Sequence, residues 1–594
     1  GLISKITEPA GRYIRFDYNP SNRLVSLTLV DQGQQNPAEE LLCSFNHSTT
    51  GSISILSSVT VPASNTVNLT TSFEYTAYST NVFFNFRSAV TNSTIYLNKV
   101  TLPNGSSCNF IYDMATRLYG PASVRQYYRV KEAYLLKSAT DYTKYTNELY
   151  KYYKGYQDLT ASTDTTDMFL EPNDIYRMQN YWMMSRKESG TTREHNSILH
   201  SSDIGDIISL YVDNGQEVKL NSQSISLDTN GLPYRISNHA FSQYGFSRQV
   251  SAVSYSWDIY GNNTNTSDLV LDYNGYYTYE TPSDKVENTY DYNQSKVTPV
   301  TSQSYSLTSS NNFGNDNYGI LKTINTISNY GEITYSKTEK WKYQDYTASK
   351  ESDMSAVLQT YDPATHNLTR TVNYDLTVTP NKSQEVQYVY DSKYNTYLES
   401  TVTKDVIKAI GNPSDVSSGT AHYDMFGQTT DTVDNNGNVT RLDYDKMGNL
   451  IKKTYPDGTY DMTEYDYIGG TVKSTPYDGL ATTTETDVFG NMVKQYEERR
   501  NLSGGIDNFL LSQTFYDTQM RVTETREYKT QATYNSTAYV YDTLSRVVIE
   551  TYKDTTGAVK TVTSNEYVLV DFFDVEINEY LTYSYAGSSV TTTV

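Results

Sequence analysis

Residues 423–492 read YDMFGQTTDTVDNNGNVTRLDYDKMGNLIKKTYPDGTYDMTEYDYIGGTVKSTPYDGLATTTETDVFGNM. Tyr423, Tyr444 and Tyr465 are 21 residues apart, and Thr486 continues the register. An acid follows each of these four residues, and a glycine stands four residues after each. The acids and glycines are Asp424, Asp445, Asp466 and Asp487, with Gly427, Gly448, Gly469 and Gly490. A fixed period of this kind indicates a repeat architecture.

A second glycine series keeps the same step at Gly437, Gly458 and Gly479, each preceded by Asn or Asp. Asn-Gly and Asp-Gly tolerate the positive φ angles of tight hairpin turns. Two turns per repeat leave segments of about ten residues, enough for one strand and its turn. Each repeat is therefore predicted to be an antiparallel β-hairpin.

Half of this unit, a glycine followed seven residues later by Tyr-Asp or Tyr-Asn, also occurs near the start of the chain. Gly11 leads to Tyr18, and Gly105 leads to Tyr112. Twelve Tyr-Asp pairs occur along the chain, where random order at this composition gives roughly four. The repeat therefore extends well beyond residues 423–492.

Composition narrows the class of protein. The chain has 59 Tyr but only 37% apolar residues, which favours wide, semi-polar sheets over one apolar core. The formal net charge of −21 argues against nucleic-acid binding. Two cysteines, Cys43 and Cys108, are too few for a disulfide framework and allow at most one disulfide bond between them. No apolar run is long enough to span a bilayer, and the first residues lack a signal-peptide pattern. We expect an excerpt or a processed product.

The repeat resembles the RHS/YD-repeat family, whose unit is roughly Tyr-Asp-x-x-Gly-Arg-Leu followed by a strand and a glycine turn. Residues 1–30 and 99–120 look like diverged copies, and NVTRLDYDKMGNLIKKTYPDGT looks nearly regular. The family includes bacterial RHS and wall-associated polymorphic toxins, the B and C components of insecticidal toxin complexes, and teneurins. The resemblance implies an all-β fold in which hairpins join into one long sheet that spirals into a hollow shell.

Four segments are expected along the chain. Residues 1–119 are degenerate repeats, 120–220 an irregular segment or insertion, 221–420 loosely spaced β repeats, and 421–594 regular repeats with trailing strands. Within the second segment, residues 130–156 fit either an amphipathic helix or two tyrosine-rich strands.

No catalytic, cofactor-binding or metal-binding residue is predicted. The Asp after each Tyr recurs in every unit, so we interpret it as a turn cap and not as an acid catalyst or metal ligand. Residues 434–438 lack the spacing of a calcium loop. The sequence EHNSILH at 194–200 is not HExxH and is expected to be a surface loop. The chain is therefore expected to be non-enzymatic, with no cofactor.

The resemblance implies a structural shell of a secreted or cell-surface protein that encloses or presents a C-terminal toxin or cargo. The expected partners are adjoining repeats and that cargo, without nucleic acid. The alternatives are an adhesin that binds a surface glycan or protein, and a tubular filament component. If a shell forms, the repeated tyrosines should line its wall, with Tyr423, Tyr444 and Tyr465 stacked in adjacent hairpins.

Overall fold

The computed structural model describes most of the chain, and every regular element in the described part is a β-strand. The described residues are 2–8, 11–31, 38–50, 53–84, 88–118, 123–154, 182–189, 192–199, 204–213, 216–228, 232–241, 247–271, 280–291, 298–307, 318–344, 347–379, 381–405, 416–542, 545–567, 580–586 and 589–593.

The strands form two sheets, one of 26 strands and one of 15. The first ten strands are β1 (Lys5–Thr7), β2 (Tyr13–Tyr18), β3 (Leu24–Asp31), β4 (Ala38–Thr50), β5 (Ile53–Pro62), β6 (Asn68–Phe84), β7 (Ser88–Thr101), β8 (Ser107–Leu118), β9 (Ser123–Leu136) and β10 (Tyr145–Lys154). The rest of the first sheet is β11 (Trp182–Ser189), β12 (Thr192–Leu199), β13 (Ile204–Asp213), β14 (Gln216–Leu227), β15 (Pro233–Phe241), β16 (Ser247–Trp257), β17 (Asn263–Leu271), β18 (Glu280–Tyr290), β19 (Pro299–Leu307), β20 (Tyr318–Ile327), β21 (Ile333–Gln344), β22 (Thr347–Tyr361), β23 (Leu368–Asp375), β24 (Lys382–Tyr390), β25 (Leu398–Asp405) and β26 (Val416–Ser417).

The second sheet contains the regular repeats. Its strands are β27 (Thr420–Tyr423), β28 (Thr429–Val433), β29 (Val439–Tyr444), β30 (Leu450–Thr454), β31 (Tyr460–Asp466), β32 (Thr471–Thr475), β33 (Thr482–Thr486), β34 (Met492–Arg500), β35 (Ile506–Tyr516), β36 (Val522–Tyr528), β37 (Tyr534–Tyr541), β38 (Val547–Lys553), β39 (Val559–Tyr567), β40 (Tyr580–Ala586) and β41 (Ser589–Thr593).

Within each sheet, consecutive strands pair antiparallel, as in β28–β29–β30. The two sheets adjoin, because the Ser418 N–H donates to the carbonyl of Thr401 in β25 (2.8 Å) and the Tyr423 hydroxyl donates to the carbonyl of Leu398 (2.6 Å). The protein is thus one long ribbon of hairpins. The predicted all-β fold of repeated antiparallel hairpins is confirmed, and neither sheet closes into a barrel over the strands described.

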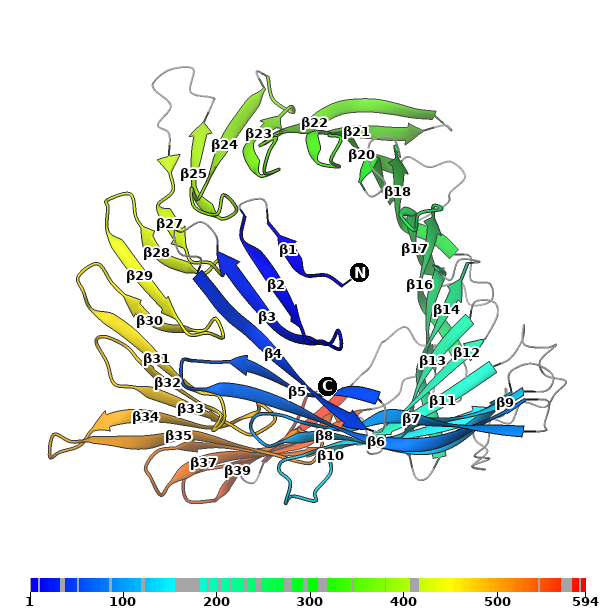
Figure 1. Ribbon diagram of the computed structural model, residues 1–594, viewed down its shortest axis with the longest axis vertical. Helices are drawn as coiled ribbons and strands as arrows, with labels where there is room; N and C mark the ends of the chain where they lie inside the picture. Colours follow the sequence, from blue (N-terminus) through cyan, green and yellow to red (C-terminus); the bar gives the residue numbers. More distant parts are fainter. Residues whose placement is uncertain are drawn as a thin grey trace.

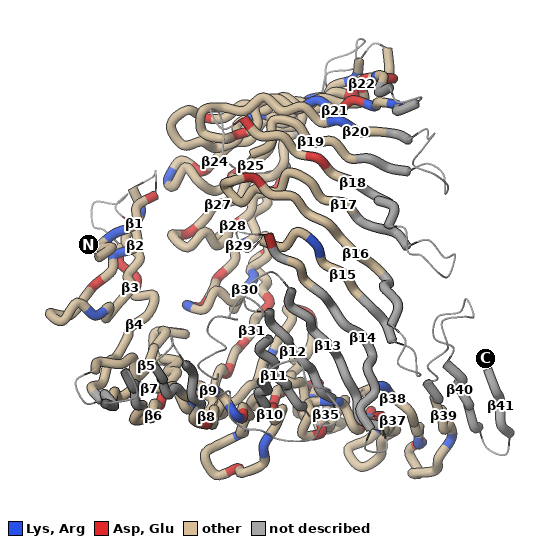
Figure 2. Tube along the Cα trace, turned by 90° about the vertical axis from the view of Figure 1, so that its right-hand side faces the viewer, with Lys and Arg blue, Asp and Glu red and all other residues tan. Residues whose placement is uncertain are grey.

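The ribbon curves around and returns to its own beginning (Figure 1). The N-terminal strands β1–β4 lie beside the ends of β24–β29 (Figure 2). The solvent-accessible surface is 35464 Å², against roughly 21,000 Å² for a compact monomer of this size. Only ten apolar side chains among those described are buried. The chain is therefore a thin curved wall and not a filled sandwich. No helix in the described part could cross a membrane.

The repeated turn has five residues and one bonding pattern. In turn 424–428 the Asp424 N–H donates to the Gln428 carbonyl (3.0 Å), and the Gly427 N–H donates to the Asp424 carbonyl (3.2 Å). Asp424 Oδ1 accepts the N–H groups of Phe426 (2.8 Å) and Gln428 (2.9 Å). Gly427 has φ 82°, and the strand register shifts beside the turn, as in a G1 bulge. Asp caps this turn, as at 434–438, 445–449 and 487–491.

Two glycines depart from this pattern. Gly437 and Gly458 have φ near 81° and 88°, but Gly479 is not in the positive region. Pro476 stands first in that turn, and proline has no N–H to donate to the fifth residue, so the five-residue form cannot close. In turn 466–470 the positive φ belongs to Gly470 (69°) and not to Gly469, because the Gly-Gly pair lets the hairpin close one residue later.

The repeated tyrosines link neighbouring hairpins. The Tyr516 hydroxyl donates to the Met492 carbonyl (3.0 Å), and the Tyr541 hydroxyl to the Val522 carbonyl (2.7 Å). Each acceptor is the first residue of the strand that follows the preceding Asp turn. The predicted stacking of Tyr423, Tyr444 and Tyr465 is wrong for these described rings. Successive repeats are two strands apart, about 9.5 Å, beyond the reach of ring contacts.

Most described residues of the 120–220 segment lie in strands. Residues 123–136 and 145–154 are β9 and β10, so the two-strand interpretation holds over the helix alternative. The expected loop at 194–200 is wrong for residues 194–199, which belong to β12. Residues 155–181 lie outside the described residues. The division of the chain into four segments stays a prediction.

Strand β6 pairs with β9 as well as with β7, so strands β6 to β9 form a closed group within the open first sheet. Tyr78, Tyr96, Tyr112 and Tyr128 pack there with ring centroids 4.2–6.2 Å apart. The Tyr112 hydroxyl donates to the Leu97 carbonyl (2.5 Å), and burial raises its pKa. Nearby Cys108 is a free thiol, as is Cys43.

Candidate functional site

Several of the buried polar residues, among them Arg12, Ser106 and Asp391, lie where two rows of turns meet, and we call this contact the seam. The N-terminal turn row comprises turns 8–12, 62–68, 102–106 and 137–146. The docked turn row comprises turns 391–397, 424–428, 445–449, 487–491 and 517–521. Contacts between the rows run in chain order from residue 12 against 397 and 425 to residue 146 against 518. The seam thus joins segments nearly 400 residues apart.

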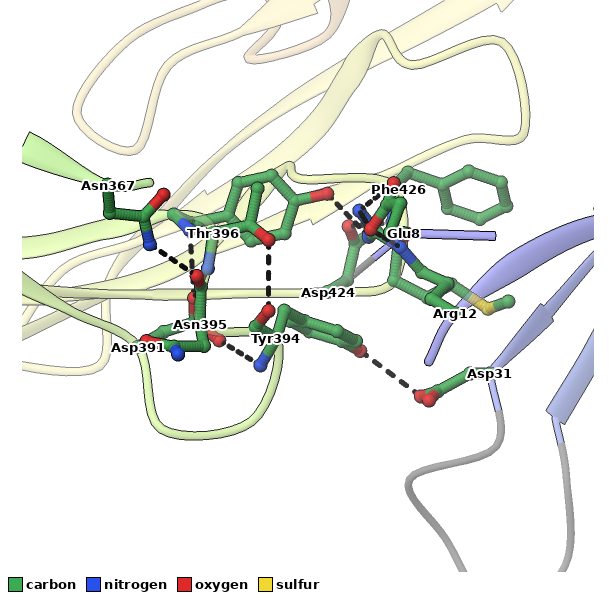
Figure 3. Close-up of polar contacts among 12 residues, drawn as sticks. Glu8, Arg12, Asp31, Asn367, Asp391, Tyr394, Asn395, Thr396, Asp424 and Phe426 are labelled. Atoms are coloured by element: carbon green, nitrogen blue, oxygen red, sulfur yellow. Dashed lines mark hydrogen bonds and ion pairs between the residues drawn. The ribbon is translucent and has the colours of Figure 1, made fainter. Parts of the chain in front are cut away.

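Arg12 forms one end of the seam and is 5% exposed. Its guanidinium donates to Glu8 across their own turn (2.6–2.9 Å), to the Tyr397 hydroxyl (2.5 Å) and to the Met425 carbonyl. Burial by itself lowers the pKa of Arg12, but the hydrogen bonds to Tyr397 and Glu8 outweigh it and raise that pKa. Arg12 therefore stays charged and ties the first hairpin to two later turns (Figure 3).

Tyr394 is the largest fully buried side chain among those described, at 2% exposure. Its hydroxyl donates to Asp31 Oδ2 at the end of β3 (3.4 Å) and accepts from Lys393 Nζ (2.5 Å), which also pairs with Asp31 (3.2 Å). Its N–H donates to Asp391 Oδ2 (2.6 Å), so turn 391–397 fixes the ring in place. Burial raises the pKa of Tyr394, which keeps its hydroxyl protonated.

Tyr397 joins these contacts into one cluster. Its ring lies 5.6 Å from Tyr394, 5.1 Å from Tyr423 and 5.1 Å from the Arg12 guanidinium carbon. A Cβ on Gly427 would stand 2.6–2.9 Å from the Tyr397 ring and hydroxyl. Gly427 is therefore required both for its positive φ and for the close approach of Tyr397.

The second residue of each docked five-residue turn supplies a backbone group to the seam. Met425 O accepts from Arg12, and Lys446 N–H donates to the Ala63 carbonyl (3.3 Å). Val488 O accepts from Asn104 Nδ2 (2.7 Å), and Thr518 O accepts from the Thr146 N–H (2.9 Å). Side chains reinforce two of these contacts, through the Lys446–Glu40 ion pair (2.6 Å) and the Phe489–Tyr145 rings (5.2 Å).

The hydrogen bonds within the turn explain why its second residue makes the contact across the seam. The first, third, fourth and fifth N–H groups bond within the turn, to its closing carbonyl, its Asp side chain or its Asp carbonyl. The second residue alone keeps both its N–H and its carbonyl outside that internal pattern. Backbone groups at a buried contact need partners, and the N-terminal turn row supplies them. Asp capping thus leaves one backbone position per repeat for docking.

Some of the repeat positions predicted from the sequence lie in the seam, and others do not. Asp424, Gly427, Asp445, Gly448, Asp487 and Gly490 lie in docked turns, and Gly11 and Gly105 lie in the N-terminal turn row. Tyr18 instead donates to the Ile3 carbonyl (2.8 Å), away from the later turns. The sequence did not single out Arg12, Asp31, Tyr394 or Tyr397. The Tyr390-Asp391 pair could have indicated a repeat turn at this place. That turn, 391–397, is two residues longer than the five-residue turn, so it does not fit the 21-residue register.

Residues 423–460 match the RHS repeat family. The resemblance inferred from the repeat is thereby confirmed over those residues. No curated protein matches the chain.

Among solved structures, the chain is similar to three assemblies of Tc toxins. The TcdB2-TccC3-TEV structure has 8% identity and a TM-score of 0.34, covering 98% of this chain and 42% of its own. The TcdB2-TccC3 structure has 10% identity and a TM-score of 0.28, covering 99% and 36%. The Photorhabdus luminescens Tc holotoxin pore has 8% identity and a TM-score of 0.30, covering 99% and 46%. The chain spans less than half the length of each.

The polar groups of the seam bind one another. The carboxylates of Glu8, Asp31 and Asp391 are all engaged by donors within the cluster. No group of His, Cys, Asp and Glu suited to a metal ion occurs in the part of the chain that the structure describes. The arrangement binds one stretch of the ribbon to another.

Proposed function

We propose that this chain is a structural wall of RHS repeats, without catalytic activity, that encloses or presents a cargo domain of a secreted or cell-surface protein. One observation carries the proposal: the curved ribbon returns to its own start and is fastened there by buried side chains. A wall open at that point would not separate its two faces, whereas the Arg12 and Tyr394 contacts hold successive turns of the ribbon together.

The test is protection of an attached domain. A small folded reporter with one protease site is fused after Val594, and its cleavage rate is compared with that of the free reporter. We expect slower cleavage in the fusion and a return toward the free rate when Arg12 and Tyr394 are both replaced by Ala. Equal rates in the unmodified fusion and the free reporter would contradict enclosure.

Adhesion is the second candidate, favoured by exposed aromatic rings on the regular array. Tyr477 and Tyr460 are 56% and 46% exposed, and Asp461, the residue after Tyr460, accepts the Tyr477 N–H (3.0 Å). Exposed tyrosine beside a carboxylate suits adaptable polar contacts. Binding of an immobilised glycan that is lost in Tyr477→Ala, with no reporter protection, would favour this role.

A further inference from the structure

Two of the chain's Asn-Gly pairs stand at the same place in five-residue turns, one in the seam and one in the regular repeats. Asn104 is the third residue of turn 102–106 in the N-terminal turn row, and Asn436 is the third residue of turn 434–438. In both turns the following glycine donates its N–H to the carbonyl of the first residue (2.9 and 3.0 Å). The glycine φ angles are 86° and 81°. The backbone around the two asparagines is therefore closely matched.

The side chains of the two asparagines are held differently. Asn104 Nδ2 donates to the Val488 carbonyl across the seam (2.7 Å), and Asn104 Oδ1 accepts the N–H (3.1 Å) and the hydroxyl (2.7 Å) of Ser106. Ser106 is 1% exposed, so these bonds are shielded from water. Asn436 is exposed, and within the part of the chain that the structure describes its side chain makes no hydrogen bond. Of the two, only Asn104 has both ends of its carboxamide engaged.

An asparagine followed by glycine is prone to deamidation, because glycine has no side chain to obstruct attack by its nitrogen. The glycine nitrogen loses its proton to hydroxide and attacks the asparagine Cγ. The new N–C bond closes a cyclic succinimide as ammonia leaves with a proton from water. Water then opens the ring at either carbonyl, which gives aspartate or isoaspartate. The attack requires the carboxamide to rotate onto the glycine nitrogen, and a carboxamide bound at both ends cannot rotate.

We propose that Asn104 is a deamidation site that the closed seam protects and that opening of the seam exposes. While the seam is closed, Ser106 and the Val488 carbonyl hold both ends of its carboxamide. Once this contact opens, the side chain is as free as that of Asn436 and reacts with the nitrogen of Gly105. The product cannot restore the contact, because a carboxylate has no N–H for the Val488 carbonyl and isoaspartate lengthens the turn backbone. Opening therefore becomes irreversible with time, whether or not the wall encloses a cargo.

The consequence is confined to one contact of the seam. The second residues of the other docked five-residue turns are met by the Arg12 guanidinium, the Ala63 carbonyl and the Thr146 N–H. None of these groups is a carboxamide, so none can form a succinimide. Among these contacts, only the one at Val488 depends on an asparagine side chain. Deamidation should therefore release this contact and leave Arg12 bound at its end of the seam.

The test compares the two asparagines within one chain by peptide mass spectrometry after incubation in heavy-oxygen water at mildly alkaline pH. In the folded chain, Asn436 should incorporate heavy oxygen about tenfold or more faster than Asn104, because the hydrogen bonds of Asn104 must break first. In urea the two should react at similar rates, since glycine follows both. Ser106→Ala removes the hydroxyl that donates to Asn104 Oδ1 and should speed the reaction at Asn104 without changing that at Asn436.

Asn104→Asp tests the consequence, because it places the aspartate product in the turn from the start. Hydrogen exchange at 487–491 should rise in this variant, whereas Asn436→Asp, at the same place in turn 434–438, is the matched control and should leave 487–491 unchanged. Far-UV circular dichroism establishes that each variant is folded. The proposal is overturned by equal rates at Asn104 and Asn436 in the folded chain, by an Asn104 that stays slow in urea, or by unchanged exchange at 487–491 in Asn104→Asp.

Discussion

The regular array at 421–567 and the seam are built from the same turn but hold together differently. In the array, Tyr541 reaches back to Val522 and Asp434 caps its own turn, so bonds rarely leave the neighbouring hairpin. In the seam, Arg12 and Tyr394 reach residues several hundred positions away and are almost fully buried. Stability in the array is a sum of local terms, whereas closure of the ribbon depends on a few long-range contacts.

This difference predicts which substitutions act locally and which open the ribbon. A change within the array should lower the stability of one hairpin and leave its neighbours paired. A change in the seam should leave every hairpin intact but release the N-terminal row from the docked row. Two matched pairs, Arg12 with Arg546 and Gly427 with Gly437, compare the seam with the array directly.

The largest effect is expected for Arg12→Ala. It removes a buried cation and leaves the Tyr397 hydroxyl and Met425 carbonyl without that donor, at a cost of about 3 kcal/mol. Urea unfolding gives the free energy, and hydrogen exchange should rise at 391–397 and 424–428. Arg546→Ala is the control: Arg546 pairs with Asp542 at the same place in its turn (2.7 Å) but is 40% exposed. If Arg12→Ala lowered the free energy of unfolding no more than Arg546→Ala does, closure of the ribbon would not depend on Arg12.

A pair of glycines sharpens the comparison. Gly427 and Gly437 have nearly the same φ, 82° and 81°, but a Cβ on Gly437 meets nothing within 4 Å. Gly437→Ala should cost about 1 kcal/mol from backbone strain alone. Gly427→Ala adds the clash with Tyr397 and should cost about 1–3 kcal/mol more. Thermal unfolding of the two variants measures the difference, and equal losses would mean that Tyr397 moves aside freely.

The sequence predicted what is local and periodic. The 21-residue register located the hairpins, the Asp caps and most positive-φ glycines, because each is decided by residues within one turn. It missed Pro476 as a breaker of one turn and the shift to Gly470 in another. It also missed the seam, since the partners of Arg12 and Asp31 depend on how far the ribbon curves before returning. No periodicity records that curvature. Tyr394 lies in a lengthened turn, and its burial follows from the same return.

Acid should weaken the array through its caps. Hydrogen bonds from the Asn438 side chain and backbone lower the pKa of Asp434, and bonds from Thr459 lower that of Asp457. A lowered folded pKa means that this stabilisation is present above the unfolded pKa of about 3.9 and is lost as pH falls through the folded pKa. Hydrogen exchange at Asn436 and Asn438 should therefore rise below about pH 4. Asp434→Asn keeps a cap that cannot titrate, so it should flatten this dependence.

The smallest effect tests why the repeat uses tyrosine and not phenylalanine. Tyr541→Phe keeps the ring but removes the hydroxyl that donates to the Val522 carbonyl (2.7 Å). The loss should be about 1 kcal/mol, the usual net contribution of one hydrogen bond. Tyr460→Phe, on a ring that is 46% exposed, is the control and should change stability little. Both are measured by urea unfolding, with hydrogen exchange on β36 and β37 to place the effect. If the two variants were equally stable, the hydroxyl would contribute nothing to joining adjacent hairpins. The abundance of tyrosine would then reflect only the semi-polar surface that a thin wall exposes on both faces.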